Sequence, residues 1–477
     1  MDLMEYIILR MDYLAIIYFM LINGTYILLN LTAFFSIRRS WFFQSVVDYD
    51  KTFQSEFYKP LSIIVPAYNE EETISENIKS ILSLQYPEFE IVVVNDGSSD
   101  GTISKLKEEF ELIPSSKVKT SDLGTKEIRE IYKAPDYPEL TVVDKENGGK
   151  ADALNAGINV AQFPLVCNID ADSLIDGQAL LKVVEPFTND WRVVAAGGSI
   201  RIANDCKIKG GEVQEVKLAR KPLVIFQVVE YLRAFLFGRV GWAAINSLLI
   251  ISGAFGVFKR KYLVKAGGYS TDTVGEDMEL VLKLNRFMKS SDRNYKVVFL
   301  PDPVCWTQVP EDRETLGKQR SRWQRGLGES LLKNKEMFFN PRFGLKGLVA
   351  YPFFVFVEFL SPIFETAGYL VILLSLIFGI GNWQLYGLFF ISAILMGILL
   401  SSLSILFEEL TFRKYTKLKD ILILFAYSIL ENLGYRQLHT WWRLRGIWDL
   451  IRGKTEWGEQ KRKKFNEQKE DVGDNYE

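Results

Sequence analysis

The sequence predicts an α/β cytosolic domain with a Rossmann-like, mostly parallel sheet, fused to α-helical transmembrane and interfacial helices. Two observations predict this class. Through the middle of the chain, short β-branched runs alternate with stretches of helical spacing, which is the pattern of a doubly wound sheet. Uncharged runs concentrate near the N-terminus and after residue 345, whereas the middle mixes apolar and charged residues. We therefore expect a soluble body between two hydrophobic ends.

The composition excludes several kinds of site. Lys and Arg number 57 against 59 Asp and Glu, so the charge gives no sign of a nucleic-acid partner. Cys167, Cys206 and Cys305 form no CxxC pair, which argues against a disulfide framework or a zinc cluster and suits a reducing compartment. His439 is the only histidine and lies beyond the soluble region. A general base or metal site there must therefore use carboxylates, and oxygen ligands select Mg²⁺ or Mn²⁺.

The first element is an uncharged run over residues 13–37 that ends at Arg38 and Arg39. It is long enough to cross a bilayer core of about 30 Å. The two arginines place the following segment in the cytosol by the positive-inside rule. A cleaved signal peptide is the competing interpretation, but it would export a domain that looks cytosolic. We expect an anchor and linker over residues 1–58.

Strands are expected next at residues 61–66, 89–95, 140–143 and 165–169, with a helix between the first two. Ligands of parallel α/β sheets bind at the carboxyl ends of the strands. The polar residues that follow each strand are therefore candidates for a site. We expect this domain over residues 59–340.

Four apolar segments follow the domain, at residues 348–360, 363–380, 385–407 and 421–430. Pro362 splits the first pair, which indicates one interfacial helix followed by one span. The basic stretches at 413–419 and 452–464 both look cytosolic. This requires an even number of crossings after the domain, or a last segment that lies along the surface. We expect helices over residues 341–451 and a cytosolic tail over 452–477, and the number of crossings stays open.

Polar turns after the first two strands form the first candidate site. Residues 66–70 read PAYNE and residues 95–102 read NDGSSDGT. Taken alone, each turn is explained equally well as a strand-to-helix turn with an N-cap. Side by side, the two turns make a polar pocket fit for a uridine, in which Asp96 accepts hydrogen bonds from the base or ribose. The donor-binding candidates here are Ala67, Tyr68, Asn69, Glu70 and Asp96.

A glycine turn, ENGGKADALN, leads into a helix at residues 146–155. The free N–H groups of a helix start, together with Lys150, suit a diphosphate, although a plain loop-to-helix junction is the alternative. The strand at 165–169 then delivers Asp170 and Asp172. Carboxylates two apart at a strand end let a divalent cation bridge them to a pyrophosphate. A DxD occurs often by chance, so the interpretation depends on its place after a buried strand and two nucleotide-like turns.

Two later motifs supply the remaining candidates. Glu276 and Asp277 open an amphipathic helix, where acids are favoured by the helix dipole alone. An Asp277 carboxylate beside a donor would nevertheless suit the deprotonation of an acceptor hydroxyl. In QRSRWQRG, a solvated helix face is the plain explanation of the arginines. Trp323 otherwise offers an apolar plate for a sugar, and Arg322 and Gln319, one turn apart, reach the pyrophosphate and the acceptor.

In order, PAYNEEETI, VNDGSSDGT, ENGGKADALN, DADS, GED and QRSRW resemble the motifs of processive family-2 membrane glycosyltransferases, such as cellulose, mixed-linkage β-glucan, poly-N-acetylglucosamine and hyaluronan synthases. The resemblance covers residues 61–328 and the flanking membrane segments. It implies a GT-A fold and a Mg²⁺- or Mn²⁺-dependent inverting displacement with Asp277 as base. The residues that it assigns to UDP and metal are Asp96, Asp170 and Asp172, and those that it assigns to the acceptor and pyrophosphate are Gln319, Arg322 and Trp323.

Two further segments resemble functional loops of these synthases. Ser252 and Gly253, in SGAF, match the loop that lines the acceptor. Thr455 and Trp457, in GKTEWG, match a gating loop over the nucleotide, although a solvated basic tail is the alternative. The chain departs from bacterial cellulose synthases because no cyclic-dinucleotide receptor domain is expected and fewer membrane segments are present. A pore would therefore be narrower or completed by a partner.

The sequence thus predicts a processive polysaccharide synthase of the plasma membrane that polymerises a β-linked glycan from a UDP-sugar. UDP-glucose and a β-1,4 or mixed β-1,3/1,4 glucan are slightly favoured, because QRSRWQRG and the tail resemble glucan-type relatives more closely. The alternatives are a poly-β-N-acetylglucosamine synthase that uses UDP-N-acetylglucosamine, non-processive transfer to a lipid phosphate, and a nucleotide-binding membrane receptor. The expected partners are the donor, the growing glycan, the bilayer, and a second copy or accessory subunit.

Overall fold

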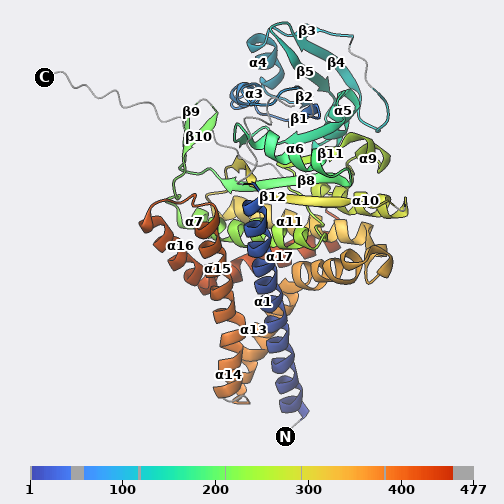
Figure 1. The fold of residues 1–477 in the computed structure, drawn as a ribbon. Coiled ribbons are helices and arrows are strands. Elements are labelled where there is room, and N and C mark those ends of the chain that lie inside the picture. Colours follow the sequence, from blue (N-terminus) through green and yellow to red (C-terminus); the bar gives the residue numbers. More distant parts are fainter. Residues whose placement is uncertain are drawn as a thin grey trace, which may run out of the picture.

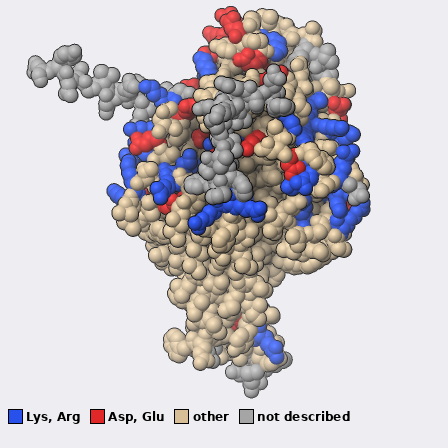
Figure 2. Space-filling model, viewed as in Figure 1, with Lys and Arg blue, Asp and Glu red and all other residues tan. Residues whose placement is uncertain are grey.

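The computed structural model describes residues 3–44, 58–116, 120–209, 211–291, 293–380 and 383–454. An α/β domain lies at one end of the molecule and a stalk of long helices at the other, with a layer of shorter helices between them (Figure 1). The N-terminus lies at the tip of the stalk. The predicted division into an apolar stalk and a mixed domain is visible in the distribution of charge, because Lys, Arg, Asp and Glu gather on the domain and leave the stalk almost bare (Figure 2).

A ten-stranded sheet runs through the domain in the order β3-β4-β5-β2-β1-β6-β11-β8-β12-β7. Its strands are β1 (Leu61–Ala67), β2 (Phe89–Asp96), β3 (Ile113–Pro114), β4 (Ile128–Ala134), β5 (Tyr137–Lys145), β6 (Leu165–Ile169), β7 (Ser173–Ile175), β8 (Val193–Ile202), β11 (Phe255–Lys259) and β12 (Lys296–Thr307). β5, β2, β1 and β6 pair in parallel, whereas β11 is antiparallel to β6 and β8. β12 also pairs with β8 in parallel. The four predicted strands form the parallel run β5-β2-β1-β6, and the predicted fold class is confirmed.

Helices pack against this sheet and deliver the site. The helices are α3 (Ile74–Leu82), α4 (Thr102–Glu109), α5 (Lys150–Val160), α6 (Ala179–Asn189), α9 (Arg260–Lys265) and α10 (Glu276–Ser290). α5 lies directly on β1, because a Cβ on Gly157 would come within 2.4 Å of Ile64 Cγ2. This close approach holds the start of α5 at the carboxyl end of the parallel strands, where the sequence predicts the site.

Three helices of the described chain are long and apolar enough to cross a membrane, within Tyr6–Arg39, Ser361–Phe378 and Trp383–Thr411. They are α1 (Leu3–Gln44), α13 (Ser361–Phe378), and the continuous α14 (Trp383–Phe390), η6 (Ile391–Leu395) and α15 (Met396–Thr411). The predicted segments at 363–380 and 385–407 are among them. The predicted segments at 348–360 and 421–430 are not among them. The segment at 421–430 lies in the layer between the stalk and the domain.

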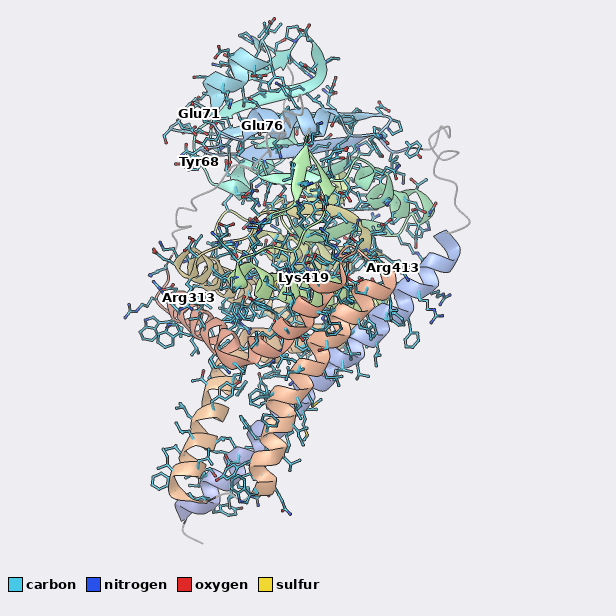
Figure 3. The ribbon with its side chains drawn as sticks, turned by 90° about the vertical axis from the view of Figure 1, so that its left-hand side faces the viewer. Tyr68, Glu71, Glu76, Arg313, Arg413 and Lys419 are labelled. Atoms are coloured by element: carbon cyan, nitrogen blue, oxygen red, sulfur yellow. The ribbon has the colours of Figure 1, made fainter. Side chains whose placement is uncertain are left out.

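The intermediate layer contains helices that lie across the stalk axis (Figure 1). Its members are α7 (Pro222–Glu230), η1 (Tyr231–Gly238), α8 (Arg239–Ala244), α11 (Arg313–Lys333), η4 (Lys346–Ala350), α12 (Tyr351–Phe353), η5 (Phe354–Phe359), α16 (Leu418–Leu430), η7 (Glu431–Tyr435) and α17 (Arg436–Ile451). Large apolar residues such as Leu418 and Ile451 are exposed there, as in helices that lie in a membrane interface. Arg313, Arg413 and Lys419 lie at the same level (Figure 3).

Candidate active site

A cavity of about 1810 Å³ begins at the carboxyl ends of the parallel strands and continues into the stalk, where Phe19 and Tyr369 line it. Every predicted site residue within the described part of the chain contributes to its wall: Ala67, Tyr68, Asn69, Glu70, Asp96, Lys150, Asp170, Asp172, Ser252, Gly253, Glu276, Asp277, Gln319, Arg322 and Trp323. The other two predicted residues, Thr455 and Trp457, lie outside the described residues. The structure therefore brings together motifs that are scattered over some 250 positions of sequence.

The turns after β1 and β2 form one continuous surface. Asn69 N donates to Ser98 Oγ at 3.0 Å, and Ser99 N donates to Asn69 Oδ1 at 2.8 Å. Glu70 N donates to Thr102 Oγ1 at 2.9 Å. Asn69 adopts a φ of 56°, in the left-handed region that Asn tolerates better than most residues. Because β1 and β2 are adjacent and parallel, the two predicted turns meet as expected.

Asp96 is buried beneath these turns and holds the glycine turn against β2. It accepts hydrogen bonds from Lys145 Nζ at 2.6 Å, Gly148 N at 3.0 Å and Gly149 N at 2.7 Å. Lys145 is fully buried and also pairs with Asp152 at 2.6 Å. Sequence reasoning missed Lys145 and Asp152, although Asp152 lies within the ENGGKAD string and Lys145 directly precedes it. A contact of Asp96 with the base or ribose stays a prediction.

Lys150, Asp170 and Asp172 form the charged floor of the cavity. Lys150 Nζ lies 2.5 Å from Asp170 Oδ1, and although burial opposes its charge, Asp170 and then Glu276 keep the pKa of Lys150 above its usual value. Burial, and then the charge of Asp170, raise the pKa of Asp172 to about 6. A desolvated carboxylate beside a second one fits a divalent cation, which would relieve their repulsion.

The described residues include no group of three or more His, Cys, Asp or Glu placed to hold a metal. A cation at Asp170 and Asp172 would therefore take its remaining ligands from water or from a bound pyrophosphate. Mg²⁺ commonly binds proteins in this way, through one or two carboxylates together with substrate phosphates. The two carboxylates fit a cation that binds together with its nucleotide.

Asp277 lies at the start of α10, facing the predicted acceptor loop. Its Oδ2 accepts from Gly253 N at 3.2 Å, and its Oδ1 accepts from Met278 N at 2.7 Å. A Cβ on Gly253 would lie 3.3 Å from Lys150 Nζ and 3.5 Å from Asp277 Cβ. The neighbouring Glu276 is buried, which raises its pKa to about 7, with Lys150 opposing and Asp277 adding to the shift. The predicted base, acceptor loop and donor lysine are thus in contact.

Glycines bring the GED motif against the helix that carries QRSRW. A Cβ on Gly275 would lie 2.6 Å from Gly326 O, so the backbones touch. Glu329 Oε2 accepts from Thr273 Oγ1 and from Val274 N, each at 2.8 Å. The turn before α10 is therefore anchored to α11 by the glycine contact and by the two bonds to Glu329.

Arg322 and Trp323 form the wall opposite the carboxylates. Burial lowers the pKa of Arg322, while Glu276, Asp170 and Asp277 oppose that shift because they lie nearby. The ring of Trp323 lies 4.2 Å from the guanidinium carbon of Arg320, which is itself buried and paired with Glu230 at 2.9 Å. Sequence reasoning missed Arg320 and Glu230. The sequence signal for Arg320 was its place within the QRSRW motif, and Glu230 had no such signal.

With this geometry established, comparison with known proteins identifies the family. A family profile described as "Glycosyltransferase like family 2" matches residues 59–326, more than half of the chain. The chain belongs to glycosyltransferase family 2. The resemblance seen in the motifs, the GT-A fold and the enzyme class are confirmed by this match.

The glycosyltransferase has relatives among bacterial polymer synthases. It is 33% identical over 275 residues to the poly-beta-1,6-N-acetyl-D-glucosamine synthase of Staphylococcus epidermidis. The aligned region covers 57% of this chain and 56% of the relative. The protein of the same name from Staphylococcus aureus (strain COL) is 32% identical over 277 residues, with the same shares covered. The chain thus matches little more than half the length of these relatives. A mannosyltransferase from Pyrobaculum calidifontis, solved with GDP-Man and Mn²⁺, covers 87% of this chain and 99% of its own, with a TM-score of 0.48 and 20% identity.

Proposed function

We propose that this glycosyltransferase polymerises a β-linked glycan from UDP-N-acetylglucosamine and passes the growing glycan through its stalk. The observation that supports the proposal is the continuity of the cavity from Asp96 and Asp172, past Asp277 and Trp323, to Phe19. A product that stays in the same cavity is already in place for the next transfer. Processive extension therefore needs no release and rebinding of the acceptor.

The relatives favour N-acetylglucosamine as the donor sugar. Both are named as synthases of a poly-N-acetylglucosamine, and neither is named for a glucan. The preference for UDP-glucose drawn from QRSRWQRG and the tail has no support among them. We therefore adopt the alternative, a UDP-N-acetylglucosamine-dependent polymer synthase.

In the proposed reaction the acceptor hydroxyl lies beside Asp277, which takes its proton while the oxygen attacks the anomeric carbon and UDP leaves. Asp170 and Asp172 would hold a divalent cation, which supplies positive charge for the departing diphosphate. Lys150 and Arg322 add fixed positive charge on two sides of that group. Attack from the face opposite UDP inverts the anomeric configuration and produces a β-linkage.

The proposal also assigns an orientation in the plasma membrane. UDP-sugars are cytosolic, so the domain would face the cytosol and the tip of the stalk the exterior. Two of the three candidate spans follow the domain, which returns the chain to the cytosolic side. Arg413 and Lys419 then lie on the cytosolic face, in agreement with the positive-inside rule.

The donor test incubates the purified full chain with radiolabelled UDP-N-acetylglucosamine or UDP-glucose. We expect high-molecular-weight product from UDP-N-acetylglucosamine alone, sensitive to an N-acetylhexosaminidase. Labelled lipid in place of polymer would favour the non-processive alternative. Polymer from UDP-glucose alone would contradict the assigned sugar, and no product from either donor would contradict the proposal as a whole.

Metal removal is a second test. We expect EDTA to abolish polymer formation and added Mg²⁺ or Mn²⁺ to restore it, because two neighbouring carboxylates repel a diphosphate unless a cation lies between them. Asp172→Ala should weaken metal-dependent binding of UDP, measured by calorimetry with and without the cation. Unchanged turnover in EDTA would show that the metal assignment is wrong.

A further inference from the structure

Arg239, the first residue of α8, lines the cavity but has no part in the reaction described above. It is 7% exposed, and its Nη1 is buried without a hydrogen-bond partner among the described residues. Two other arginines of the cavity wall are paired. The buried Arg320 lies 2.9 Å from Glu230, and the half-buried Arg233 lies 2.5 Å from Glu431. Arg239 makes no ion pair within the described chain, so it differs from its neighbours.

Arg239 contacts a neighbour of the proposed sugar plate and interacts with the charge of the proposed base. Its guanidinium carbon lies 4.7 Å from the ring centroid of Phe235, whose own centroid lies 5.6 Å from that of Trp323. Burial lowers the pKa of Arg239 to about 10, and the charge of Asp277 opposes the shift. The guanidinium is therefore charged at neutral pH and close enough to Asp277 to interact with it.

A buried charged donor without a partner is costly, on the order of 1–3 kcal/mol or more. Contact with Phe235 offsets part of this cost, since a cation over an aromatic face is attracted to it. The ring satisfies only the face of the guanidinium, however, because the N–H groups point outward in its plane. The edge that contains Nη1 is thus available to an oxygen atom that enters the cavity.

The local backbone has a form that is common at functional sites. Residues Tyr231–Gly238, directly before Arg239, form the π-helical segment η1. π-helical turns inside α-helices are rare in proteins and are frequently found at functional sites. Here the π-helical segment directly precedes Arg239, which contacts Phe235 and interacts with the charge of Asp277.

We propose that Arg239 binds the terminal sugar of the acceptor, with Nη1 donating a hydrogen bond to an oxygen of that sugar. The sugar then lies against Trp323 with its reacting hydroxyl toward Asp277. This inference rests on the proposed function and deepens it, because it names a residue that recognises the acceptor and not the donor.

The test measures acceptor and donor kinetics separately, with the full chain, UDP-N-acetylglucosamine and N-acetylglucosamine oligosaccharides. For Arg239→Gln we expect the acceptor KM to rise by about tenfold or more, as for the loss of one hydrogen bond from a charged group, with the donor KM and the pH profile unchanged. Arg239→Lys should give an intermediate rise, because it keeps the charge and loses the planar fork. Equilibrium binding of the oligosaccharide to UDP-loaded protein should weaken in parallel.

Arg201→Gln is the matched control. Arg201 is 5% exposed, pairs with Glu408 of α15 at 2.6 and 3.0 Å, and does not line the cavity. Its loss leaves Glu408 unpaired, so the control should lower the melting temperature and leave the acceptor KM unchanged. An unchanged acceptor KM in Arg239→Gln, or a shifted pH profile without a change in that KM, would overturn the inference. Absence of polymer from the wild-type chain would instead contradict the proposed function.

Discussion

Asp277 is held in position by protein contacts before any substrate binds. Its two oxygens accept from Gly253 N and Met278 N, and both donors belong to the backbone. A carboxylate fixed in this way needs little reorganisation when the acceptor arrives. The contact with Gly253 also ties the base to the loop predicted to line the acceptor.

Replacing this carboxylate by an amide is the sharpest test of the base. Asp277→Asn keeps the shape of the side chain and removes its basicity. We expect polymer formation to be abolished while UDP still binds, as measured by product radioactivity and by calorimetry. Retention of more than about a tenth of the activity would count against Asp277, since general bases typically contribute factors of about 10²–10⁴.

Glu276 has a pKa of about 7 in the fold, above its ordinary 4.5, mainly because it is buried. Lys150, Asp277 and Arg322 are the charged groups that face it. Between pH 4.5 and 7 the folded chain keeps a proton that the unfolded chain has lost, so Glu276 makes stability fall as the pH rises through this window.

We therefore expect the melting temperature of the nucleotide-free protein to fall more steeply between pH 4.5 and 7 in the wild type than in Glu276→Gln. The amide stays neutral throughout, so the variant should be the more stable of the two above pH 7. Parallel melting curves across the window would contradict the raised pKa. Differential scanning fluorimetry in detergent is sufficient for the comparison.

At the scale of elements, α11 is held between two other helices by contacts that only glycine permits. On one side Gly326 meets Gly275 before α10, and on the other a Cβ on Gly317 would lie 2.6 Å from Trp442 Nε1 of α17. Ser321 Oγ also donates to Trp442 O at 2.8 Å. The helix that carries Arg322 and Trp323 is therefore positioned by the last helix of the described chain.

Gly326→Ala tests this packing. Its Cβ would lie 2.7 Å from Gly275 N, and because the clash is with backbone, the start of α10 must move. We expect a loss of about 1–3 kcal/mol in stability and a lower kcat. Gly387→Ala in α14 is the control, since its Cβ meets no atom of the described residues within 4 Å and should lower neither quantity. Equal kcat values for the two variants would show that the contact does not position the site.

At the scale of the whole molecule, the cavity ends inside the stalk. Going outward, the last wall residues are Phe19 on α1, Tyr369 on α13 and Ala393 on η6. The ring of Phe19 lies 6.0 Å from that of Tyr369 and 5.5 Å from that of Phe389, and these two are 6.0 Å apart. At 1.5 Å per helical residue, about 9 Å of α14, about 14 Å of α13 and about 24 Å of α1 lie beyond this cluster.

The cluster of Phe19, Tyr369 and Phe389 should therefore keep ions out while no glycan occupies the stalk. We expect Phe19→Ala combined with Phe389→Ala to make substrate-free proteoliposomes leak ions, as measured with an entrapped pH-sensitive dye. The wild type should stay tight, as should Leu14→Ala, whose side chain on α1 is 66% exposed. A tight double variant would show that the seal lies elsewhere.

Much of the site could be predicted from sequence because its residues follow strands. Asp96 and Asp170 each come at or directly after the end of a parallel strand, and all such ends meet at one edge of a sheet. The motif residues within the described chain accordingly met in one cavity, and the apolar runs at 13–37, 363–380 and 385–407 fall on the three candidate spans. Strand ends, apolar runs and motifs are each defined by residues that are close together in the sequence, so the sequence alone predicts them.

Which partners these residues have was decided only by the tertiary structure. The pairing of Glu230 with Arg320 joins positions 90 residues apart, and the hydrogen bond between Lys145 and Asp96 joins positions 49 apart. Nothing in the sequence near Arg239 indicates that its guanidinium lacks an ion-pair partner among the residues that the structure describes. The burial of a side chain and the partner it meets depend on which helices and strands pack together. Packing is a property of the assembled fold, so the local sequence pattern does not reveal either of them.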